Sequence, residues 1–278
     1  MVERSRNGKS TSGLFAITVD DGEGDNVRAL SQLFLAKQWP ASFYLPTHYV
    51  DTGTGMMYQW WRRVKPLLPR RQLELRSGVL NLSSPGAVDA LSRKMEWLWH
   101  TQRLECYLPL TMDLVELVER ETGLKRAAIR PEPPISWPEV EALSKSDLIG
   151  FESHGVSHAA MSSLTEEELV FEMRHSRDRV AEHTGRPCRH LAYPFGSPPS
   201  IGAQAAATAA QFYDSAVTMS LGHVGSANPW LLPRIPLYPE NSLRFARLKI
   251  LLKCRTFGPA EGHASERLRC GCTGESGP

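Results

Sequence analysis

The amino-acid sequence predicts an α/β fold, a distorted parallel barrel of alternating β-strands and α-helices with a helical insertion. Short apolar segments rich in β-forming residues alternate with segments in which apolar residues recur at helical spacing. Polar clusters follow several of the expected strands, and the chemistry of β/α barrels gathers at the carboxyl ends of their strands. The 278 residues suffice for one such domain, which we assign to residues 13–240.

The expected elements begin with a strand–helix–strand unit. Residues 14–19 form a short apolar segment typical of a buried strand, and Asp-Asp-Gly follows it. Apolar residues at helical spacing predict a helix over residues 26–38, which ends before Pro40. Residues 41–46 predict the next strand. This succession indicates a parallel sheet.

Residues 52–146 are expected to form a helical insertion, because their clustered tryptophan, methionine and leucine residues suggest helices with apolar faces. Strand signals resume after the insertion, and four further strands are expected at residues 148–151, 189–193, 216–219 and 232–237.

One helix has clear start and stop signals. Thr165 and Glu168 have the spacing of a capping box, in which each side chain accepts a backbone N–H of the other residue. The helix is expected to run to about His183, and Gly185 is the expected C-terminal stop.

The remaining residues, 241–278, are expected to form a C-terminal extension. From residue 256 onward the composition is rich in Gly, Ser, Glu and Arg, which is typical of a disordered tail. Three of the five cysteines (Cys254, Cys270 and Cys272) lie in this extension. The cysteines are odd in number and scattered, so they do not indicate a secreted disulfide framework, and their spacing matches no common zinc pattern.

Composition gives weaker guidance on partners and location. The net charge of +2 provides no electrostatic case for a nucleic-acid partner. No segment approaches the roughly 20 apolar residues that cross a bilayer. The first residues carry positive charge but no apolar core of a signal peptide, so a cytoplasmic protein is expected.

The first polar cluster is Thr18-Val-Asp-Asp-Gly22. Successive strand side chains point to opposite faces, so Asp20 and Asp21 can reach one site only where the strand ends or kinks, and Gly22 permits such a turn. Two carboxylates this close repel unless a cation or a proton lies between them. The alternative is an acidic turn that caps the following helix.

The second cluster contains His154 and His158, four residues apart after an expected strand. Two histidines at this spacing can face one metal ion. Both could instead be ordinary surface or core residues. Gly155 follows the first histidine where a zinc-protease motif has glutamate, so a base for activating water has to come from elsewhere, with Asp20 or Asp21 as candidates.

The third cluster, Tyr193-Pro-Phe-Gly196, also follows an expected strand. We expect Tyr193 to have a free backbone N–H near the barrel mouth, and Pro194 to fix the turn after it. An aromatic plug in the barrel rim is the alternative interpretation.

These clusters, in this order, resemble the motifs of the polysaccharide deacetylase family, also called the NodB-homology domain or carbohydrate esterase family four. The resemblance covers residues 13–240 and includes a fourth segment, Leu232-Pro-Arg-Ile235. It implies a NodB-type barrel that removes N-acetyl groups from an amino sugar in a polysaccharide or sugar conjugate.

The resemblance also implies roles for individual residues. Asp21, His154 and His158 would bind a divalent metal, usually Zn²⁺ in this family, and Asp20 would be the general base for water activated by the metal. The backbone N–H of Tyr193 would stabilise the oxyanion. Arg234 would pair with Asp20 and orient it.

Many family members supply a late histidine as general acid for the leaving amine. No such histidine follows Arg234 here, which leaves His48 and His223 as candidates. Without either, Asp20 would have to return the proton itself.

Two alternatives to a sugar deacetylase stay open. One is a hydrolase of another non-peptide C–N bond on the same fold. The other is a non-catalytic carbohydrate-binding module, which the missing late histidine favours and the intact Asp20 opposes. The expected substrates include lipid-linked and nucleotide-linked sugars.

Overall fold

The computed structural model describes residues 14–102, 104–222, 224, 228–238 and 241–255. The chain divides into two compact units, residues 1–236 and 237–278. The described part of the second unit contains the helix α12 (Leu243–Arg255). The predicted disordered tail, residues 256–278, lies outside the described residues. None of the described helices combines the length and apolar character that a bilayer-spanning segment needs.

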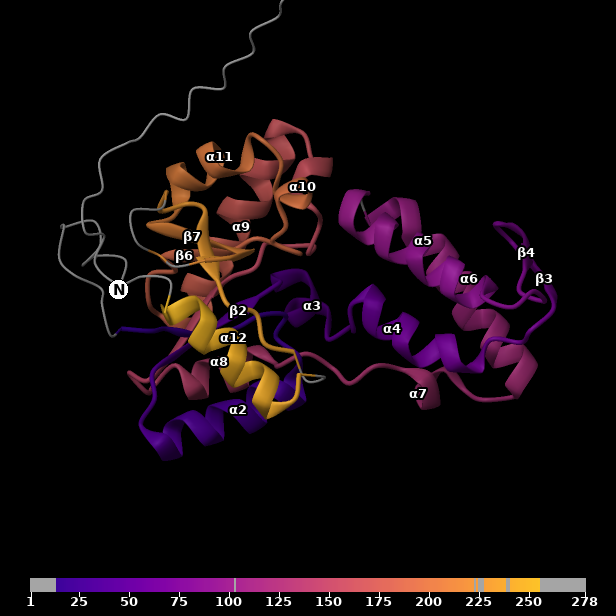
Figure 1. The fold of residues 1–278 in the computed structure, drawn as a ribbon, viewed down its shortest axis with the longest axis horizontal. Helices are drawn as coiled ribbons and strands as arrows, with labels where there is room; N and C mark the ends of the chain where they lie inside the picture. The colour runs from indigo at the N-terminus through magenta and orange to yellow at the C-terminus, as the bar shows by residue number, and fades with distance from the viewer. Residues whose placement is uncertain (1–13, 103, 223, 225–227, 239–240, 256–278) are drawn as a thin grey trace, which may run out of the picture. The chain divides into compact units, whose positions relative to one another are not determined.

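The first unit is built on a curled, six-stranded parallel sheet in the order β1-β2-β5-β6-β7-β8 (Figure 1). Its strands are β1 (Ile17–Val19), β2 (Ala41–Leu45), β5 (Ile149–Ser153), β6 (His190–Ala192), β7 (Ser215–Leu221) and β8 (Leu232–Arg234). Each corresponds to a strand predicted from the sequence, which confirms the α/β fold. The sheet forms a half-barrel, with β1 and β8 as its two edges.

Helices flank this sheet. They are α2 (Gly24–Lys37), α9 (Glu166–Thr184), α10 (Pro198–Ile201) and α11 (Ala205–Phe212), with a 3₁₀ turn η2 (Met161–Ser163) before α9. Helix α9 packs against β5 and α11. Its predicted capping box is confirmed, because the Thr165 N–H donates to Glu168 and the Glu168 N–H donates to Thr165 Oγ1. Gly185 ends the helix with φ 64°.

The main hydrophobic core lies between the sheet and these helices. Phe43 of β2 is fully buried, with its ring 6.2 Å from that of Phe34 on α2 and 5.7 Å from that of Phe151 on β5. Burial of a large apolar side chain is worth about 1.5–3 kcal/mol. The burial of the apolar strand side chains therefore stabilises the sheet, and the sheet determines where the loops after its strands begin.

The insertion lies between β2 and β5. It contains α3 (Thr47–Thr52), α4 (Met57–Val64), the 3₁₀ turn η1 (Lys65–Leu67), β3 (Gln72–Leu75), β4 (Gly78–Asn81), α5 (Ala87–Thr101), α6 (Leu104–Thr122), α7 (Arg126–Ile129) and α8 (Trp137–Leu143). A second hydrophobic core belongs to it, with Trp60, Trp61, Met95 and Leu114 among its buried members.

The insertion, expected to be helical, also contains an antiparallel hairpin of β3 and β4 at residues 72–81, which the sequence analysis did not predict. The segment Gln-Leu-Glu-Leu alternates polar and apolar residues, which is the pattern of a half-buried strand. Leu73 is buried and pairs with Leu80, while the intervening polar side chains face outward. Tryptophan-rich neighbours on both sides concealed this short period-two signal.

A buried hydroxyl network fastens the end of β5 to the helices behind it. The Tyr213 hydroxyl donates to the carbonyl of Met173 at 2.5 Å and lies 2.8 Å from the hydroxyl of Ser153. The Ser153 hydroxyl is 2.6 Å from that of Ser176 on α9. Ser153 directly precedes His154, so this network anchors the start of the loop that carries both predicted histidine ligands.

We expect Tyr213→Phe to lower the free energy of unfolding by about 1–3 kcal/mol, because it leaves buried polar groups unpaired while keeping the ring. Urea denaturation monitored by circular dichroism measures this change. Tyr238→Phe is the control, because Tyr238 is exposed and belongs to the second compact unit. Equal stability of the two variants would contradict the anchoring role of Tyr213.

Candidate metal centre and active site

Two neighbouring aspartates follow β1, and the backbone turns sharply at the second. Asp21 has φ 77° and Gly22 has φ 63°. Both lie in the left-handed region, which glycine adopts readily and aspartate adopts at a cost. A Cβ atom on Gly22 would also lie 2.9 Å from Cδ2 of Leu45. The turn that the sequence predicted at Gly22 is therefore present, and it sends the two carboxylates to different partners.

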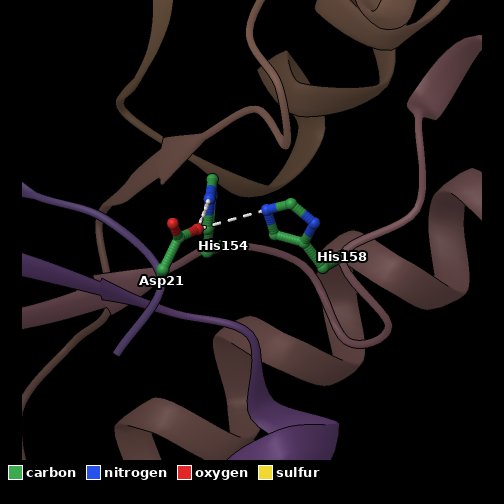
Figure 2. Close-up of side chains that lie close together, drawn as sticks. All are labelled: Asp21, His154 and His158. Atoms are coloured by element: carbon green, nitrogen blue, oxygen red, sulfur yellow. Dashed lines mark ion pairs between the residues drawn. The ribbon is translucent and has the colours of Figure 1, made fainter. Parts of the chain in front are cut away.

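Asp21 lies against both predicted histidines, which come from the loop after β5 (Figure 2). Its Oδ1 is 3.3 Å from Nε2 of His154 and 3.2 Å from Nε2 of His158. Ligand atoms around a tetrahedral zinc ion at about 2.0–2.1 Å are roughly 3.3 Å apart. Among the described residues, these three form the group of His, Cys, Asp and Glu that could hold a metal ion.

The orientation of His154 favours a cation at this place. Its Nδ1 lies 2.7 Å from the carbonyl oxygen of Ala192, so the ring donates from Nδ1. In the neutral imidazole this leaves a lone pair on Nε2, which faces the carboxylate of Asp21. Two electron pairs at this distance repel unless a proton or a cation lies between them. A backbone carbonyl behind a ligating histidine is the usual arrangement at metal sites.

The pKa values of Asp21 and His154 reflect two opposing effects, burial and the attraction between the carboxylate and the imidazoles. Burial would raise the pKa of Asp21, but the two imidazoles hold it well below its usual range. Burial would lower the pKa of His154, but the carboxylates of Asp21 and Asp20 raise it. Both shifts therefore have the same cause, the attraction between the carboxylate and the imidazoles. The donor set of two nitrogens and one carboxylate oxygen fits a catalytic zinc site, which keeps three protein ligands.

Glu172 of α9 holds the loop that carries the two histidines. Its buried carboxylate accepts the N–H of Val156 at 2.6 Å and the N–H of Ser157 at 3.1 Å, as well as the Ser157 hydroxyl. A Cβ atom on Gly155, which has φ 75°, would lie 2.9 Å from Glu172 Oε2. The close approach of this carboxylate therefore requires glycine between the histidines.

Asp20 pairs with Arg234 of β8. The guanidinium donates to both carboxylate oxygens, at 2.7 and 2.6 Å. It also donates to Thr18 Oγ1 and to the carbonyl of Thr218. This is the pairing that the sequence analysis predicted, and such two-pronged bonds fix a carboxylate in one orientation.

The prediction of a free backbone N–H on Tyr193 was wrong. This N–H donates to the carbonyl of Val217 at 3.2 Å, because the hydrogen bonding between β6 and β7 continues one residue past the strand. Two residues later, Phe195 has φ 60°, and no acceptor lies within hydrogen-bonding reach of its N–H in the described part of the chain. The ring of Phe195 lies 4.8 Å from that of His158.

Of the two predicted general acids, His48 makes no contact with the triad in the structure. The backbone N–H of His48 donates to Val156, but the ring packs edge-on against Tyr49. His223 lies outside the described residues. His100 of α5, which sequence reasoning missed, has its ring 4.2 Å from that of Phe195, and burial lowers its pKa.

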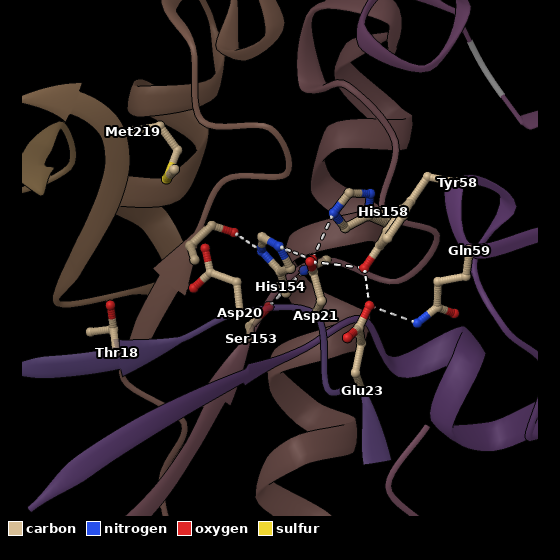
Figure 3. Close-up of polar contacts among 12 residues, drawn as sticks. Thr18, Asp20, Asp21, Glu23, Tyr58, Gln59, Ser153, His154, His158 and Met219 are labelled. Atoms are coloured by element: carbon tan, nitrogen blue, oxygen red, sulfur yellow. Dashed lines mark hydrogen bonds and ion pairs between the residues drawn. The ribbon is translucent and has the colours of Figure 1, made fainter. Parts of the chain in front are cut away.

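Sequence reasoning also missed Tyr58, which contacts Asp21 (Figure 3), and Glu172, which bonds the loop that carries the histidines. Tyr58 of α4 donates its hydroxyl toward Asp21 Oδ2 at 3.1 Å. Glu172 was missed although a signal was available, because it stands at helical spacing among buried residues, between Leu169 and Ser176 on the inner face of α9. A carboxylate on an apolar face requires hydrogen-bond donors. No local pattern identified Tyr58.

We expect Glu172→Gln to lower metal affinity about 10-fold or more and to destabilise the fold by about 1–3 kcal/mol, because an amide presents its NH₂ group to backbone donors. Metal titration and urea denaturation measure the two effects. Glu167→Gln, on the exposed side of the same helix, is the matched control. Unchanged metal affinity in Glu172→Gln would show that the histidine loop needs no such support.

Comparison with solved structures shows that this chain shares the fold of known deacetylases. A deacetylase from Streptococcus pyogenes, solved with acetate, is 13% identical with a TM-score of 0.56, over 91% of this chain and 76% of that one. A polysaccharide deacetylase from Bacillus cereus is 14% identical with a TM-score of 0.52, over 90% and 55%. A de-N-acetylase from Aggregatibacter actinomycetemcomitans is 14% identical with a TM-score of 0.52, over 89% and 80%.

Among curated protein sequences, none matches this chain significantly. The family model described as polysaccharide deacetylase matches residues 7–212 of the 278. This match contains three of the four motifs from which the resemblance was drawn. The chain therefore belongs to the polysaccharide deacetylase family, whose members are hydrolases that remove acetyl groups from sugars.

Proposed function

We propose that this protein is a divalent-metal-dependent hydrolase that removes N-acetyl groups from an amino sugar within a polysaccharide or sugar conjugate. The observation that carries the proposal is the convergence of Asp21, His154 and His158 beside the paired Asp20. Family membership supplies the reaction class, and the donor set supports metal dependence.

Asp21, His154 and His158 would hold the cation, and their two nitrogens and one oxygen suit Zn²⁺. A bound Zn²⁺ supplies Lewis acidity, which lowers the pKa of water and polarises the acetyl carbonyl. The remaining chemistry falls to the residues around this centre.

Asp20 is the proposed general base. It is partly buried, its side chain being 22% exposed, and Arg234 holds both of its oxygens. A carboxylate fixed in this way can take a proton from the attacking water without first reorienting. Carbon–oxygen bond formation at the acetyl carbon then gives a tetrahedral oxyanion.

The proposed oxyanion donor is the backbone N–H of Phe195, in place of that of Tyr193. The Phe195 N–H has no acceptor in the described part of the chain, and its ring contacts His158. A fixed donor of this kind contributes about 3–4 kcal/mol in measured cases.

Collapse of the tetrahedral species breaks the C–N bond, and the amine nitrogen needs a proton to leave. Asp20 carries the proton taken from water and can return it to this nitrogen, which balances the reaction with acetate and a free amino sugar as products. Roles for His48 and His223 in this step stay predictions. Acetate is the molecule bound in the related Streptococcus pyogenes deacetylase.

The first experiment measures bound metal per chain by elemental analysis. We expect about one zinc-like ion in the wild type and its loss in Asp21→Ala and His154→Ala, because a site with two remaining ligands binds weakly. His175→Ala, on the exposed face of α9, is the control and should keep the ion. A wild type that binds no ion after reloading would refute metal dependence.

The second experiment separates the proposed base from the metal ligands. We expect Asp20→Asn to lower the rate of acetate release from an N-acetylated oligosaccharide by about 10²–10⁴-fold, because the amide cannot accept the proton. Its metal content should stay at the wild-type level. The control is Asp178→Asn, at an exposed position. Binding of metal and oligosaccharide by the wild type without acetate release would instead favour the carbohydrate-binding module.

A further inference from the structure

The carboxylate of Asp21 uses its two oxygens differently. Oδ1 faces the two histidine nitrogens, at 3.3 and 3.2 Å. Oδ2 is 3.1 Å from the hydroxyl of Tyr58, which belongs to the first turn of α4 in the insertion (Figure 3). A cation held by both histidines would therefore meet Oδ1, while Oδ2 is already engaged by a donor from another part of the fold.

The position of Tyr58 is itself fixed by neighbouring contacts. Its hydroxyl also lies 2.8 Å from Glu23 Oε1, which accepts the Gln59 side-chain amide at 2.9 Å. The oxygen of that amide accepts the N–H of Met56, so its orientation is determined. Two adjacent side chains of α4 thus fasten the start of the helix to the loop that follows Asp21.

A second part of the insertion holds the same loop from its backbone. The N–H of Ile135 donates to the carbonyl of Gly22 at 2.9 Å, and the N–H of Gly24 donates to the carbonyl of Pro133 at 3.3 Å. The loop that carries Asp21 is therefore bonded to both chain segments of the insertion, before α8 and at α4.

The Tyr58 hydroxyl is suited to donating a hydrogen bond to Asp21 and unsuited to binding the metal ion. This hydroxyl has one hydrogen, and the two oxygens that it faces, Oδ2 of Asp21 and the nearer Oε1 of Glu23, are both carboxylate acceptors. A protonated phenol beside Oδ2 competes with any metal contact at that oxygen. Hydrogen-bonding partners behind metal ligands fix the ligand orientation and typically change metal affinity 10–100-fold when removed.

We propose that Tyr58 is a positioning residue of the metal centre, which holds Oδ2 of Asp21 so that this carboxylate binds the cation through Oδ1 alone. The inference rests on the proposed metal-dependent function. It gives the insertion a role in the chemistry, because the coordination mode of a ligand on the β1 loop then depends on a side chain of α4.

The test compares Tyr58→Phe with Tyr107→Phe, which removes a buried hydroxyl elsewhere in the insertion. Competition with a chromophoric chelator measures the Kd for Zn²⁺, and we expect it to rise about 10–100-fold in Tyr58→Phe alone. The d–d absorption of the Co²⁺-loaded protein reports the coordination number. It should weaken in Tyr58→Phe, because a released Asp21 can bind through both oxygens.

Gln59→Met separates the orientation of Asp21 by Tyr58 from the general attachment of α4 to the β1 loop. Gln59 bonds α4 to Glu23 but does not contact Asp21. We expect this variant to keep the wild-type Co²⁺ spectrum. Three outcomes would overturn the proposal. Gln59→Met and Tyr58→Phe could change the Co²⁺ spectrum equally, or Tyr58→Phe could bind Zn²⁺ with the wild-type Kd. The third is that metal-free Tyr58→Phe unfolds at a much lower temperature than metal-free Tyr107→Phe. A wild type that binds neither ion would instead refute the proposed function itself.

Discussion

The site depends on one electrostatic contact, the approach of a carboxylate oxygen of Asp21 to the Nε2 atoms of His154 and His158 at 3.2–3.3 Å. Electron-rich atoms remain this close only around a proton or a cation. The parallel register of β1, β2 and β5 brings their carboxyl ends to one edge, and the loops after β1 and β5 meet there. The apolar core that fixes the sheet therefore also sets the distance between ligands that are 133 residues apart in sequence.

Residues with strained backbone conformations lie close to the contact between Asp21 and the two histidines. Of the non-glycine residues with positive φ in the described chain, three lie at the site: Asp21, His158 and Phe195. Such conformations cost of order 1–3 kcal/mol each and persist where surrounding structure fixes them. Here the bonds from Glu172 to the histidine loop and from Ile135 to the β1 loop provide that support. Strain at Asp21 and His158 accompanies the convergence of these two ligands, and the strained Phe195 places its ring 4.8 Å from that of His158.

The sequence predicted what local patterns determine. Short apolar segments rich in β-forming residues located all six strands of the parallel sheet, and the cap of α9 followed from Thr165 and Glu168. The triad and the pairing of Arg234 with Asp20 came from a family resemblance. Sequence reasoning missed the hairpin of β3 and β4, whose short period-two signal lies between tryptophan-rich segments. It also missed the engaged N–H of Tyr193 and the hydroxyl of Tyr58, because each depends on a contact with a distant segment. Tyr58 meets Asp21 across 37 residues, and nothing in its own neighbourhood distinguishes it from a core tyrosine.

The edges of the open sheet give Arg234 a double role. As edge strands, β1 and β8 are joined by side chains, since Arg234 of β8 bonds to Thr18 and Asp20 beside β1 while its Nε donates to Thr218 on β7. The same guanidinium thus connects the two sheet edges and orients the proposed base. Because an ammonium group cannot make two parallel bonds to one carboxylate, lysine at this position would preserve charge but lose the orientation. The orientation of the proposed base therefore depends on the bonds that connect the two sheet edges. In the same way, the orientation of Asp21 depends on the bonds between the β1 loop and the insertion.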